Sequence, residues 1–206
     1  MDMVLFATFL NFALITSFTP GPNNLIAMAS GTAFGWRRTV PQMLGIASGV
    51  SSMVLLAALG LEEVIDRWPV ILQIVRILGG LWLMWLAWQF VRAALFSGKS
   101  GQGGITQLGK PLTFLQAAGM QGVNPKAWAL VTGSLSAYVE LMPTPFQTAL
   151  LMALVFSTIT PASVSLWALG GASLRVLLST GRWARWLNLL MAAMILATAL
   201  MILFDV

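Results

Sequence analysis

The sequence contains neither cysteine nor histidine. Without thiols the chain has no disulfides and no thiolate metal sites, and without imidazoles it has no zinc site or histidine catalysis of the usual kind. Charge is also scarce, because charged residues make up 8% of the 206 positions, against about 25% in a typical soluble domain. These absences argue against most enzyme classes and against a soluble fold.

Apolar residues fill the chain instead. Hydrophobic residues make up 58% of it and the mean hydropathy is +0.87. Since about 20 apolar residues form one membrane-spanning helix, the sequence predicts an all-α, polytopic membrane protein. The first residues, Met1, Asp2 and Met3, lack the basic stretch of a cleavable signal peptide, so we expect the first apolar segment to be retained.

Six apolar segments are recognisable. They cover about residues 3–34, 40–61, 68–91, 112–139, 146–169 and 186–204. The first has 32 residues, and a straight helix of that length would be about 48 Å long against a hydrocarbon core of about 30 Å. The fourth is also too long. Prolines interrupt both, at residues 20–24 and 122–126, so each is predicted to be a broken helix. Pro41 is expected to start the second segment, after residues 35–38 close the first.

The charged residues separate into two groups. Eight bases follow the first, third and fifth segments, and all six acids fall on the other side. The bases are Arg37, Arg38, Arg92, Lys99, Lys110, Arg175, Arg182 and Arg185, and the acids are Asp2, Glu62, Glu63, Asp66, Glu140 and Asp205. The positive-inside rule then predicts six spans in the bacterial cytoplasmic (inner) membrane with both termini outside. This arrangement explains the net charge of +5 without a nucleic-acid partner.

The two halves match in plan. Pro22 and Pro125 lie about half a chain length apart, and each half has three segments of which the first is broken. An odd number of spans inverts the second half, so the pattern predicts two inverted three-helix repeats, as in secondary transporters. We therefore expect one transmembrane transporter domain over residues 1–206, with repeat one at about 1–96, a cytoplasmic linker at 97–110 and repeat two at about 111–206.

The two breaks are the candidate substrate pathway. Broken helices free backbone N–H and C=O groups, which lipid tolerates only beside protein or a watery cavity. Helix N-termini suit a carboxylate, and the amides and the lysine add further polar groups, so the breaks suit a small zwitterion. The candidates are Pro20, Gly21, Pro22, Asn23, Asn24, Asn124, Pro125 and Lys126, with Arg76 and Gln121 as secondary candidates. The alternative is a pair of kinked packing helices in which Lys126 and Arg76 extend to an interface.

Several motifs resemble one transporter family. Residues 19–24 read TPGPNN and are followed by Gly-Trp-Arg at 35–37, residues 76–83 read RILGGLWL, and residues 122–127 read GVNPKA. Gly45 and Gly49 add a small-xxx-small spacing that allows close helix approach. In this order the motifs resemble the lysine-exporter superfamily, the LysE/RhtB type of amino-acid effluxers, although Trp82 stands where tyrosine is usual. The resemblance implies export of amino acids or their derivatives, driven by the proton gradient.

Residues 85–88, Trp-Leu-Ala-Trp, together with TPGPNN are most similar to the branch that exports cysteine and O-acetylserine. The partners implied are an amino-acid substrate and the lipid bilayer, with a homodimer as one open assembly and no cofactor or metal. Proton antiport has two candidate carriers, Lys126 or the substrate itself, because no acid lies in the predicted spans.

Four other functions are the alternatives to proton-coupled amino-acid export. A facilitator would let the substrate run down its own gradient without protons. A small-ion or metal permease would need ligands near the breaks, where only amides, hydroxyls and carbonyls are available. A membrane enzyme lacks nucleophiles, bases and metal ligands, and a structural membrane subunit would not need two breaks.

Overall fold

The computed structural model describes residues 2–61, 67, 69–96, 110–173 and 181–204, and every regular element among them is helical. The α-helices are α1 (Met3–Phe18), α2 (Pro22–Phe34), α3 (Trp36–Leu56), α5 (Pro69–Phe96), α6 (Phe114–Gly119), α7 (Pro125–Ala137), α8 (Pro145–Ser173) and α10 (Gly181–Phe204). Short turns are η1 (Ala57–Leu61), η3 (Met120–Val123) and η4 (Val139–Leu141). The all-α class predicted from the sequence is confirmed for these residues.

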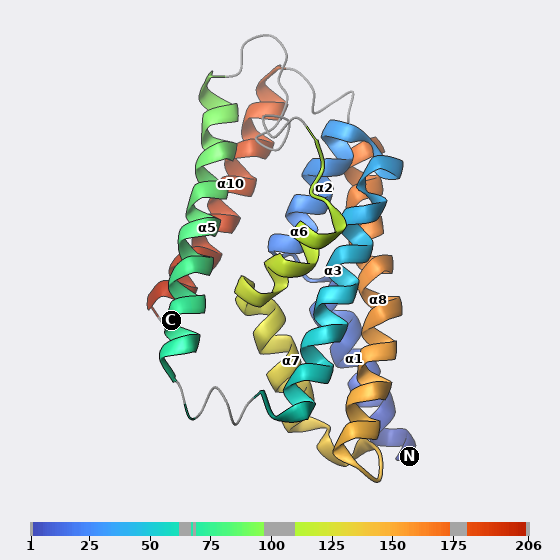
Figure 1. The fold of residues 1–206 in the computed structure, drawn as a ribbon. Coiled ribbons are helices and arrows are strands. Elements are labelled where there is room, and N and C mark those ends of the chain that lie inside the picture. The colour runs from blue at the N-terminus through green and yellow to red at the C-terminus, as the bar shows by residue number, and fades with distance from the viewer. Residues whose placement is uncertain (1, 62–66, 68, 97–109, 174–180, 205–206) are drawn as a thin grey trace.

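The helices run alternately along the long axis of the molecule (Figure 1). α1 and α2 together run from one end to the other, α3 returns, α5 runs up, α6 and α7 together run down, α8 runs up, and α10 runs back toward the end where α1 begins. α3 and α2 pack against α8, while α5 packs chiefly against α10. Two crossings of the bundle are therefore each made of two helices in series, α1 with α2 and α6 with α7.

The first break lies where the prolines predict it. α1 ends at Phe18, α2 begins at Pro22, and the two axes differ by 50°. Pro22 occupies the first position of α2, where its missing N–H is not needed. The second break is built differently, because the short α6 leads through the 3₁₀ turn η3 to Asn124, and α7 starts at Pro125. Here too a proline begins the second piece.

The turn between the first two crossings is shorter than predicted. Residues 36–38 do not close the first segment but form the first turn of α3, and Pro41 lies inside that helix rather than at its start. The reason is Gly35, whose φ of 83° lies in the left-handed region that glycine tolerates. Its N–H bonds Gly31 O at 2.9 Å and ends α2, so a single residue reverses the chain.

Close helix crossings hold the breaks in place. A Cβ at Gly45 would overlap Phe114 O, and one at Gly49 would lie 2.6 Å from Gln121 Cγ and 2.7 Å from Ala118 O. The small-xxx-small pair of α3 thus lets α6 and η3 approach, as its spacing predicts. Gly31 and Gly171 serve the crossing of α2 with α8 in the same way.

Three apolar clusters surround the breaks. One joins α1, α3, α7 and α8 around Phe9, Met152 and Phe156; a second joins α2, α5 and α10 around Phe90 and Ile195. The third joins α2, α3, α6 and α8 and includes residues 27, 46, 117, 164 and 168. At the breaks, Asn24, Gln121 and Asn124 are buried beside these clusters, whereas Thr19 and Pro20 are exposed.

Three of the described helices are long and apolar enough to span a membrane, at residues 36–60, 77–95 and 145–173, and the bent pair α1–α2 makes a fourth. Residues 185–200 form a shorter apolar helix. The structure therefore supports a multi-pass protein, while the full count of six spans stays a prediction.

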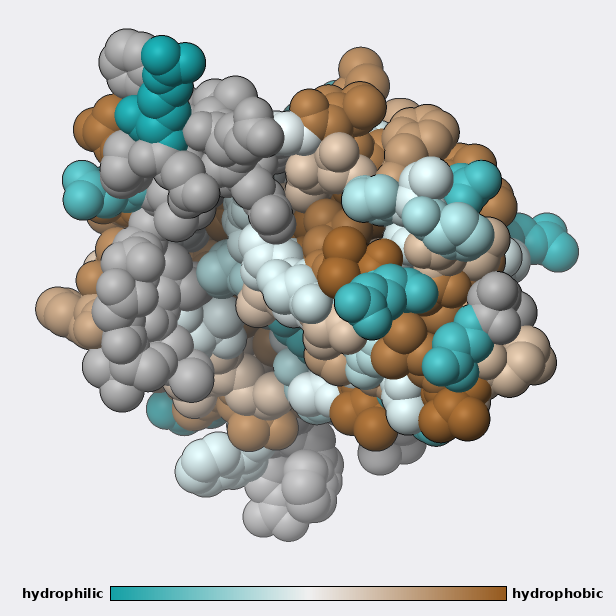
Figure 2. Space-filling model, turned by 90° about the horizontal axis from the view of Figure 1, so that it is seen from below, coloured by the Kyte–Doolittle hydropathy of each residue, from teal (hydrophilic) through white to brown (hydrophobic). Residues whose placement is uncertain are grey.

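Most of the described charges separate by end, as predicted. Asp2 and Glu140 lie where α1 begins and where α7 meets α8, and the bases Arg37, Arg38, Arg92, Lys110 and Arg185 lie toward the opposite end (Figure 1). The described base Arg67, just before α5, is the exception and lies at the end of Asp2 and Glu140. The surface of the first end mixes hydrophilic and hydrophobic residues (Figure 2). Positions outside the described residues are Glu62, Glu63, Asp66, Lys99, Arg175 and Asp205, most of the predicted linker 97–110, and the side chain of Arg182.

Candidate functional site

The two breaks meet in the middle of the bundle. Asn23 of α2 donates from Nδ2 to Gln121 Oε1 at 2.9 Å, and Gln121 Nε2 donates back to Asn23 Oδ1 at 3.1 Å. Gln121 belongs to η3 and is fully buried, and its Nε2 also donates to Ala117 O at 3.0 Å. This reciprocal amide pair joins the break in the first half of the chain to the break in the second half.

The end of α1 presents two carbonyl groups to this region. Asn24 Nδ2 donates to Ser17 O at 3.0 Å and to Thr19 O at 2.9 Å. Ser163 of α8 also donates its hydroxyl to Ser17 O, at 2.7 Å. Because the last carbonyls of a helix lack intrahelical partners and carry partial negative charge, this end of α1 attracts donors from two other helices.

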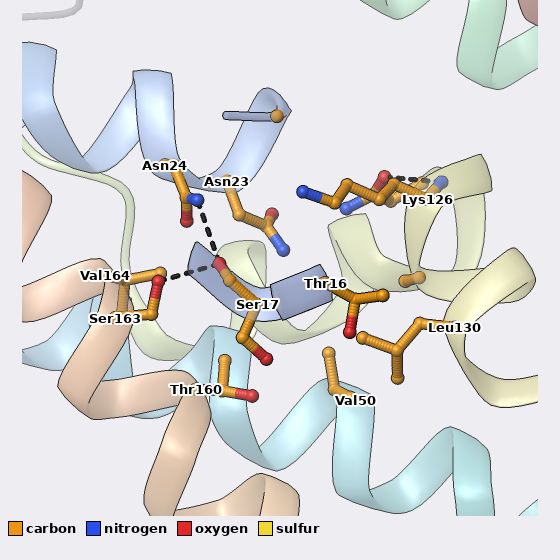
Figure 3. A pocket seen from close by; sticks show the side chains of 13 residues that line it. Thr16, Ser17, Asn23, Asn24, Val50, Lys126, Leu130, Thr160, Ser163 and Val164 are labelled. Carbon is orange, nitrogen blue, oxygen red and sulfur yellow. Dashed lines mark hydrogen bonds between the residues drawn. The ribbon is translucent and has the colours of Figure 1, made fainter. Parts of the chain in front are cut away.

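Lys126 reaches one of these two carbonyls, Thr19 O, from the second half of the chain. Its ammonium Nζ donates to Thr19 O at 2.5 Å. The side chain lies directly against Gly21, where a Cβ would come within 2.7 Å of Lys126 Cδ and 3.0 Å of Nζ. Figure 3 shows Lys126 extending from α7 toward Asn23. The lysine therefore bridges the two breaks and does not extend away from them to an interface.

The two helix N-termini at the breaks are not equivalent. No side chain caps α2, and in its first turn only Leu25 N has a backbone partner, Gly21 O at 3.0 Å. α7 is capped by Asn124, whose Oδ1 accepts from Lys126 N at 3.1 Å. The first turn of α2 therefore keeps N–H groups available to an anion, whereas the first turn of α7 has its own acceptor.

These groups line a cavity of about 40 Å³. A cavity needs about 10–15 Å³ to hold one water molecule, so this one admits a few waters and is too small for an amino acid. The polar lining residues come from α1, the two breaks and α8, and apolar residues such as Val164, beside Ser163, lie among them (Figure 3). They are Thr16, Ser17, Gly21, Asn23, Asn24, Asn124, Lys126, Thr160 and Ser163, and the apolar ones are Val50, Ala127, Leu130 and Val164.

One polar atom of this lining has no partner within the described part of the chain. Ser17 Oγ is buried and makes no hydrogen bond there. In a membrane interior an unpaired hydroxyl is unfavourable. The atom is therefore available to a ligand that enters between α1 and α8.

A second cavity of about 380 Å³ lies at the end of the bundle where α7 meets α8. Its lining comes from the end of α3 with η1, the end of α7 and the start of α8. The residues are Ala57, Ala58, Gly60, Leu135, Ser136, Val139, Pro145 and Thr148. α7 and α8 each contribute lining residues to both cavities.

Most of the candidates from the sequence are brought together. Gly21, Asn23, Asn24, Asn124 and Lys126 line the small cavity, and the secondary candidate Gln121 bonds Asn23 and Asn124. Pro20, Pro22 and Pro125 shape the breaks without lining the cavity, and Pro20 is exposed. Arg76 belongs to α5, but its side chain lies outside the described residues.

Four polar lining residues were missed by the sequence analysis, as were the four apolar ones. Thr16 and Ser17 precede the first break, and Thr160 and Ser163 flank Pro161 within α8. Hydroxyls beside a break or a proline in an apolar segment are a usable signal, because such positions leave backbone carbonyls free. α8 stays one helix through Pro161, from Pro145 to Ser173.

Metal-binding groups are not gathered at this site. Across the described ranges no three Asp or Glu side chains lie close enough to hold a metal ion together. Lys126 is the ionisable side chain among the residues lining the small cavity. The arrangement offers carbonyls, amides, hydroxyls and one ammonium, which are groups suited to a small polar organic ligand.

Comparison with known proteins gives a consistent result. The family described as LysE type translocator matches residues 14–205. The cysteine/O-acetylserine efflux protein of Klebsiella pneumoniae subsp. pneumoniae is 30% identical over 209 aligned residues, which is 100% of both chains. The proteins of the same name from Salmonella paratyphi A and Escherichia coli O139:H28 are each 27% identical over 207 residues, 99% of this chain and 100% of theirs. No solved structure matches.

Proposed function

The chain belongs to the family of LysE type translocators and is an amino-acid efflux transporter of the bacterial inner membrane, not an enzyme; from this premise we propose how it works and what it carries. The proposed substrates are small zwitterionic amino acids of the cysteine and O-acetylserine kind. The proposed site is the polar cavity between the two breaks. The observation that carries the proposal is the meeting of both breaks through Lys126 and the Asn23–Gln121 pair.

The proposed architecture is six spans arranged as two inverted repeats with both termini outside. Pro22 and Pro125 each begin the second piece of a broken crossing. The later helices of each half also pack against their counterparts, α3 against α8 and α5 against α10. Such pairing is what a twofold relation between the halves would produce.

The break between α1 and α2 suits a zwitterion because it places opposite partial charges side by side. The carbonyls of Ser17 and Thr19 end α1, and the uncapped N-terminus of α2 begins three residues further on. An α-amino acid carries its ammonium and carboxylate on one carbon atom. Each charge then has a matching helix end without any carboxylate in the cavity.

The substrate class rests on both the site and the relatives. The polar side chains of the lining are amides, hydroxyls and one ammonium, and the apolar residues Val50, Leu130 and Val164 line the same cavity. This combination favours a short side chain of intermediate polarity. The full-length relatives named above are cysteine/O-acetylserine efflux proteins, and their names match that chemistry. The larger cavity at the end of α7 is the proposed exit.

An export assay tests this function. Cells lacking their own exporters would be loaded with cysteine, with O-acetylserine, with lysine or with a divalent cation, and efflux would be followed with and without the chain. We expect faster efflux of the first two compounds only. Efflux of the cation alone would instead support the small-ion permease.

Proton antiport is the proposed driving mechanism, with Lys126 or the substrate as the proton carrier. Lys126 is the ionisable group in the cavity lining. Substrate-loaded vesicles with an imposed pH gradient and no membrane potential would show an altered efflux rate if protons are exchanged. Equal efflux with and without the gradient would leave a facilitator as the mechanism.

The topology can be tested with single cysteines, because the chain has none of its own. Lys110 and Glu140 are exposed at opposite ends of the bundle. A cysteine at position 110 should react with an impermeant thiol reagent only from the cytoplasm, and one at position 140 only from outside. Labelling of both from the same side would contradict the proposed arrangement.

A further inference from the structure

The ammonium of Lys126 is held where the ammonium of a substrate would be expected. It donates to Thr19 O at the end of α1, the helix end with partial negative charge. Thr19 O also accepts from Asn24 Nδ2, and Ser17 O accepts from Asn24 and Ser163. A cluster of carbonyls that binds several N–H and O–H donors at once is a binding place for a primary ammonium group.

The cavity beside this cluster is nearly filled. Its volume is about 40 Å³, and the stem of Lys126 occupies the space next to Gly21. Since an amino acid does not fit in that volume, some side chain must move before a substrate can reach the carbonyls. Lys126 is a suitable candidate, because its long stem has several rotatable bonds whereas Ser17, Thr19 and Asn24 are fixed close to the backbone.

Moving the ammonium has an electrostatic cost. No carboxylate lines the cavity, so a Lys126 displaced from Thr19 O would lose its partner inside the membrane, where an unpaired charge is unfavourable. A substrate that brings a carboxylate supplies a new partner at the same moment. The uncapped first turn of α2, beside Gly21, can bind a second oxygen of that carboxylate.

We propose that Lys126 is the specificity-determining residue, whose ammonium occupies the substrate's ammonium subsite at Thr19 O until a zwitterion exchanges partners with it. The substrate ammonium takes the carbonyls, and the released Lys126 ammonium takes the substrate carboxylate. This inference rests on the proposed export of zwitterionic amino acids and adds the rule by which they are selected.

The exchange explains why both charged groups would be required. An amine without a carboxylate displaces Lys126 and leaves its charge unpaired. A carboxylate without an amine draws Lys126 away and leaves Thr19 O with Asn24 Nδ2 as its remaining donor. Each analogue therefore gives up one charged contact that the zwitterion keeps, so both analogues bind more weakly. The buried and unpartnered Ser17 Oγ offers the zwitterion one more contact.

Three thiol compounds test the exchange. Cysteine carries both groups, cysteamine lacks the carboxylate, and 3-mercaptopropionate lacks the amine. They can be used with a reductant because the chain has no cysteine and no disulfide to protect. Dissociation constants would be measured by calorimetry on the purified full chain in lipid nanodiscs, for the wild type, Lys126→Met and the control Lys110→Met.

The wild type should bind cysteine at least about tenfold more tightly than either analogue, a difference of about 1.4 kcal/mol. In Lys126→Met the ammonium position at Thr19 O is vacant and the carboxylate partner is gone, so cysteine should bind more weakly and cysteamine more tightly, and the preference between them should disappear. Lys110→Met should keep the wild-type ratio, because Lys110 is exposed at the end of the bundle.

Other outcomes separate this inference from the proposed function. If Lys126→Met weakens cysteine and cysteamine by the same factor, Lys126 does not occupy the ammonium subsite and the inference is wrong, while zwitterion export still stands. If the wild type binds none of the three compounds, the proposed substrate class and the exchange both fail. Should Lys126→Met not fold, Lys126→Gln serves instead. It keeps a neutral donor for Thr19 O, and it should again lose the preference for cysteine over cysteamine.

Discussion

The break between α1 and α2 and the break between α6 and α7 share a proline but differ in how the helix end that follows is capped. Both place a proline at the first position of the second helix piece, Pro22 in α2 and Pro125 in α7. The first break is open, because α2 has no side-chain cap and the last carbonyls of α1 are bound by side chains from elsewhere. The second break is closed, in the sense that its backbone groups have partners within the break. The 3₁₀ turn η3 leads from α6 to α7, and Asn124 caps the first turn of α7.

We expect this difference to give each half of the chain a different part in transport. The open break supplies backbone carbonyls and N–H groups, which can be exchanged between protein donors and a ligand. The closed break supplies side chains, Gln121 and Lys126, from a rigid support. A transporter needs both properties, since a site must be organised to be selective and must have groups that can change partners to release what it binds.

The largest expected effect comes from removing the group that joins the breaks. Lys126→Ala deletes the ammonium that bonds Thr19 O and should reduce export to the level of cells without the chain. Export of cysteine or O-acetylserine and the amount of inserted protein would both be measured, with Lys110→Ala as the matched control.

Lys126→Arg should restore export only in part, because a planar guanidinium differs in size and geometry from an ammonium. Full export by Lys126→Ala, at a normal level of insertion, would show that the bridge between the breaks has no part in transport.

Gly21→Ala should disturb the open break without changing any charge. Gly21 has φ −167°, which any residue adopts, so the effect is steric. The new methyl would lie 2.7 Å from Lys126 Cδ and 3.0 Å from Nζ, so the lysine must move away from Thr19. We expect a several-fold lower export rate at unchanged expression.

Gly133→Ala is the control for this change. Gly133 lies in α7, and a methyl there meets only Phe12 Cζ at 3.8 Å, an ordinary contact. Its export should equal that of the wild type. Equal export by both variants would mean that the position of Lys126 beside Gly21 does not matter.

The sequence alone predicts the positions of the two breaks but not the hydrogen-bond partners of the groups they free. Pro20, Pro22 and Pro125 identify where the crossings are interrupted, because a proline removes a backbone donor regardless of its surroundings. The partners of the freed groups depend on tertiary packing. Nothing in the local sequence connects Asn23 with Gln121, which lies in the other half of the chain.

The hydroxyl residues of α8 that the sequence analysis missed also depend on tertiary packing for their partners. Thr160 and Ser163 are two hydroxyls in an apolar helix, and such residues usually bond the carbonyl one turn back in their own helix. Ser163 instead bonds Ser17 O of α1. The turn at Gly35 was misplaced for a different reason, because Pro41 gave a stronger helix-start signal than a single glycine with φ 83°.

A smaller effect is expected from the amide pair that links the breaks. Gln121→Ala leaves the amide of Asn23 without its partner, which costs about 1–3 kcal/mol. Asn23→Ala should cost less, because Gln121 keeps its bonds with Ala117 O and Asn124 Nδ2. The double variant loses the pair as a whole. Since interhelical hydrogen bonds in membranes contribute about 0.6 kcal/mol on average, the two bonds should give a coupling energy of about 1 kcal/mol.

This coupling would be measured as a double-mutant cycle on the free energy of unfolding in mixed detergent micelles. The pair Thr8→Ala and Ser165→Ala, which share no hydrogen bond in the structure, serves as the reference. Effects of Asn23→Ala and Gln121→Ala that add to within about 0.3–0.5 kcal/mol would mean that the breaks are not joined by this pair.

The smallest effect concerns the cap that closes the second break. Asn124 Oδ1 accepts from Lys126 N at 3.1 Å, and Asn124 Nδ2 donates to Gln121 Oε1 at 3.2 Å. Asn124→Ala should lower the free energy of unfolding by about 1 kcal/mol, the usual cost of losing an N-cap. Asn124→Ser keeps a cap oxygen but loses the contact with Gln121, so it should recover most of that loss.

Export should fall modestly in Asn124→Ala, because the first turn of α7 holds Lys126 in line with Thr19, and should recover in the serine variant. If both variants lose stability and export equally, the contact of Asn124 with Gln121, and not the cap, is what keeps the second break closed.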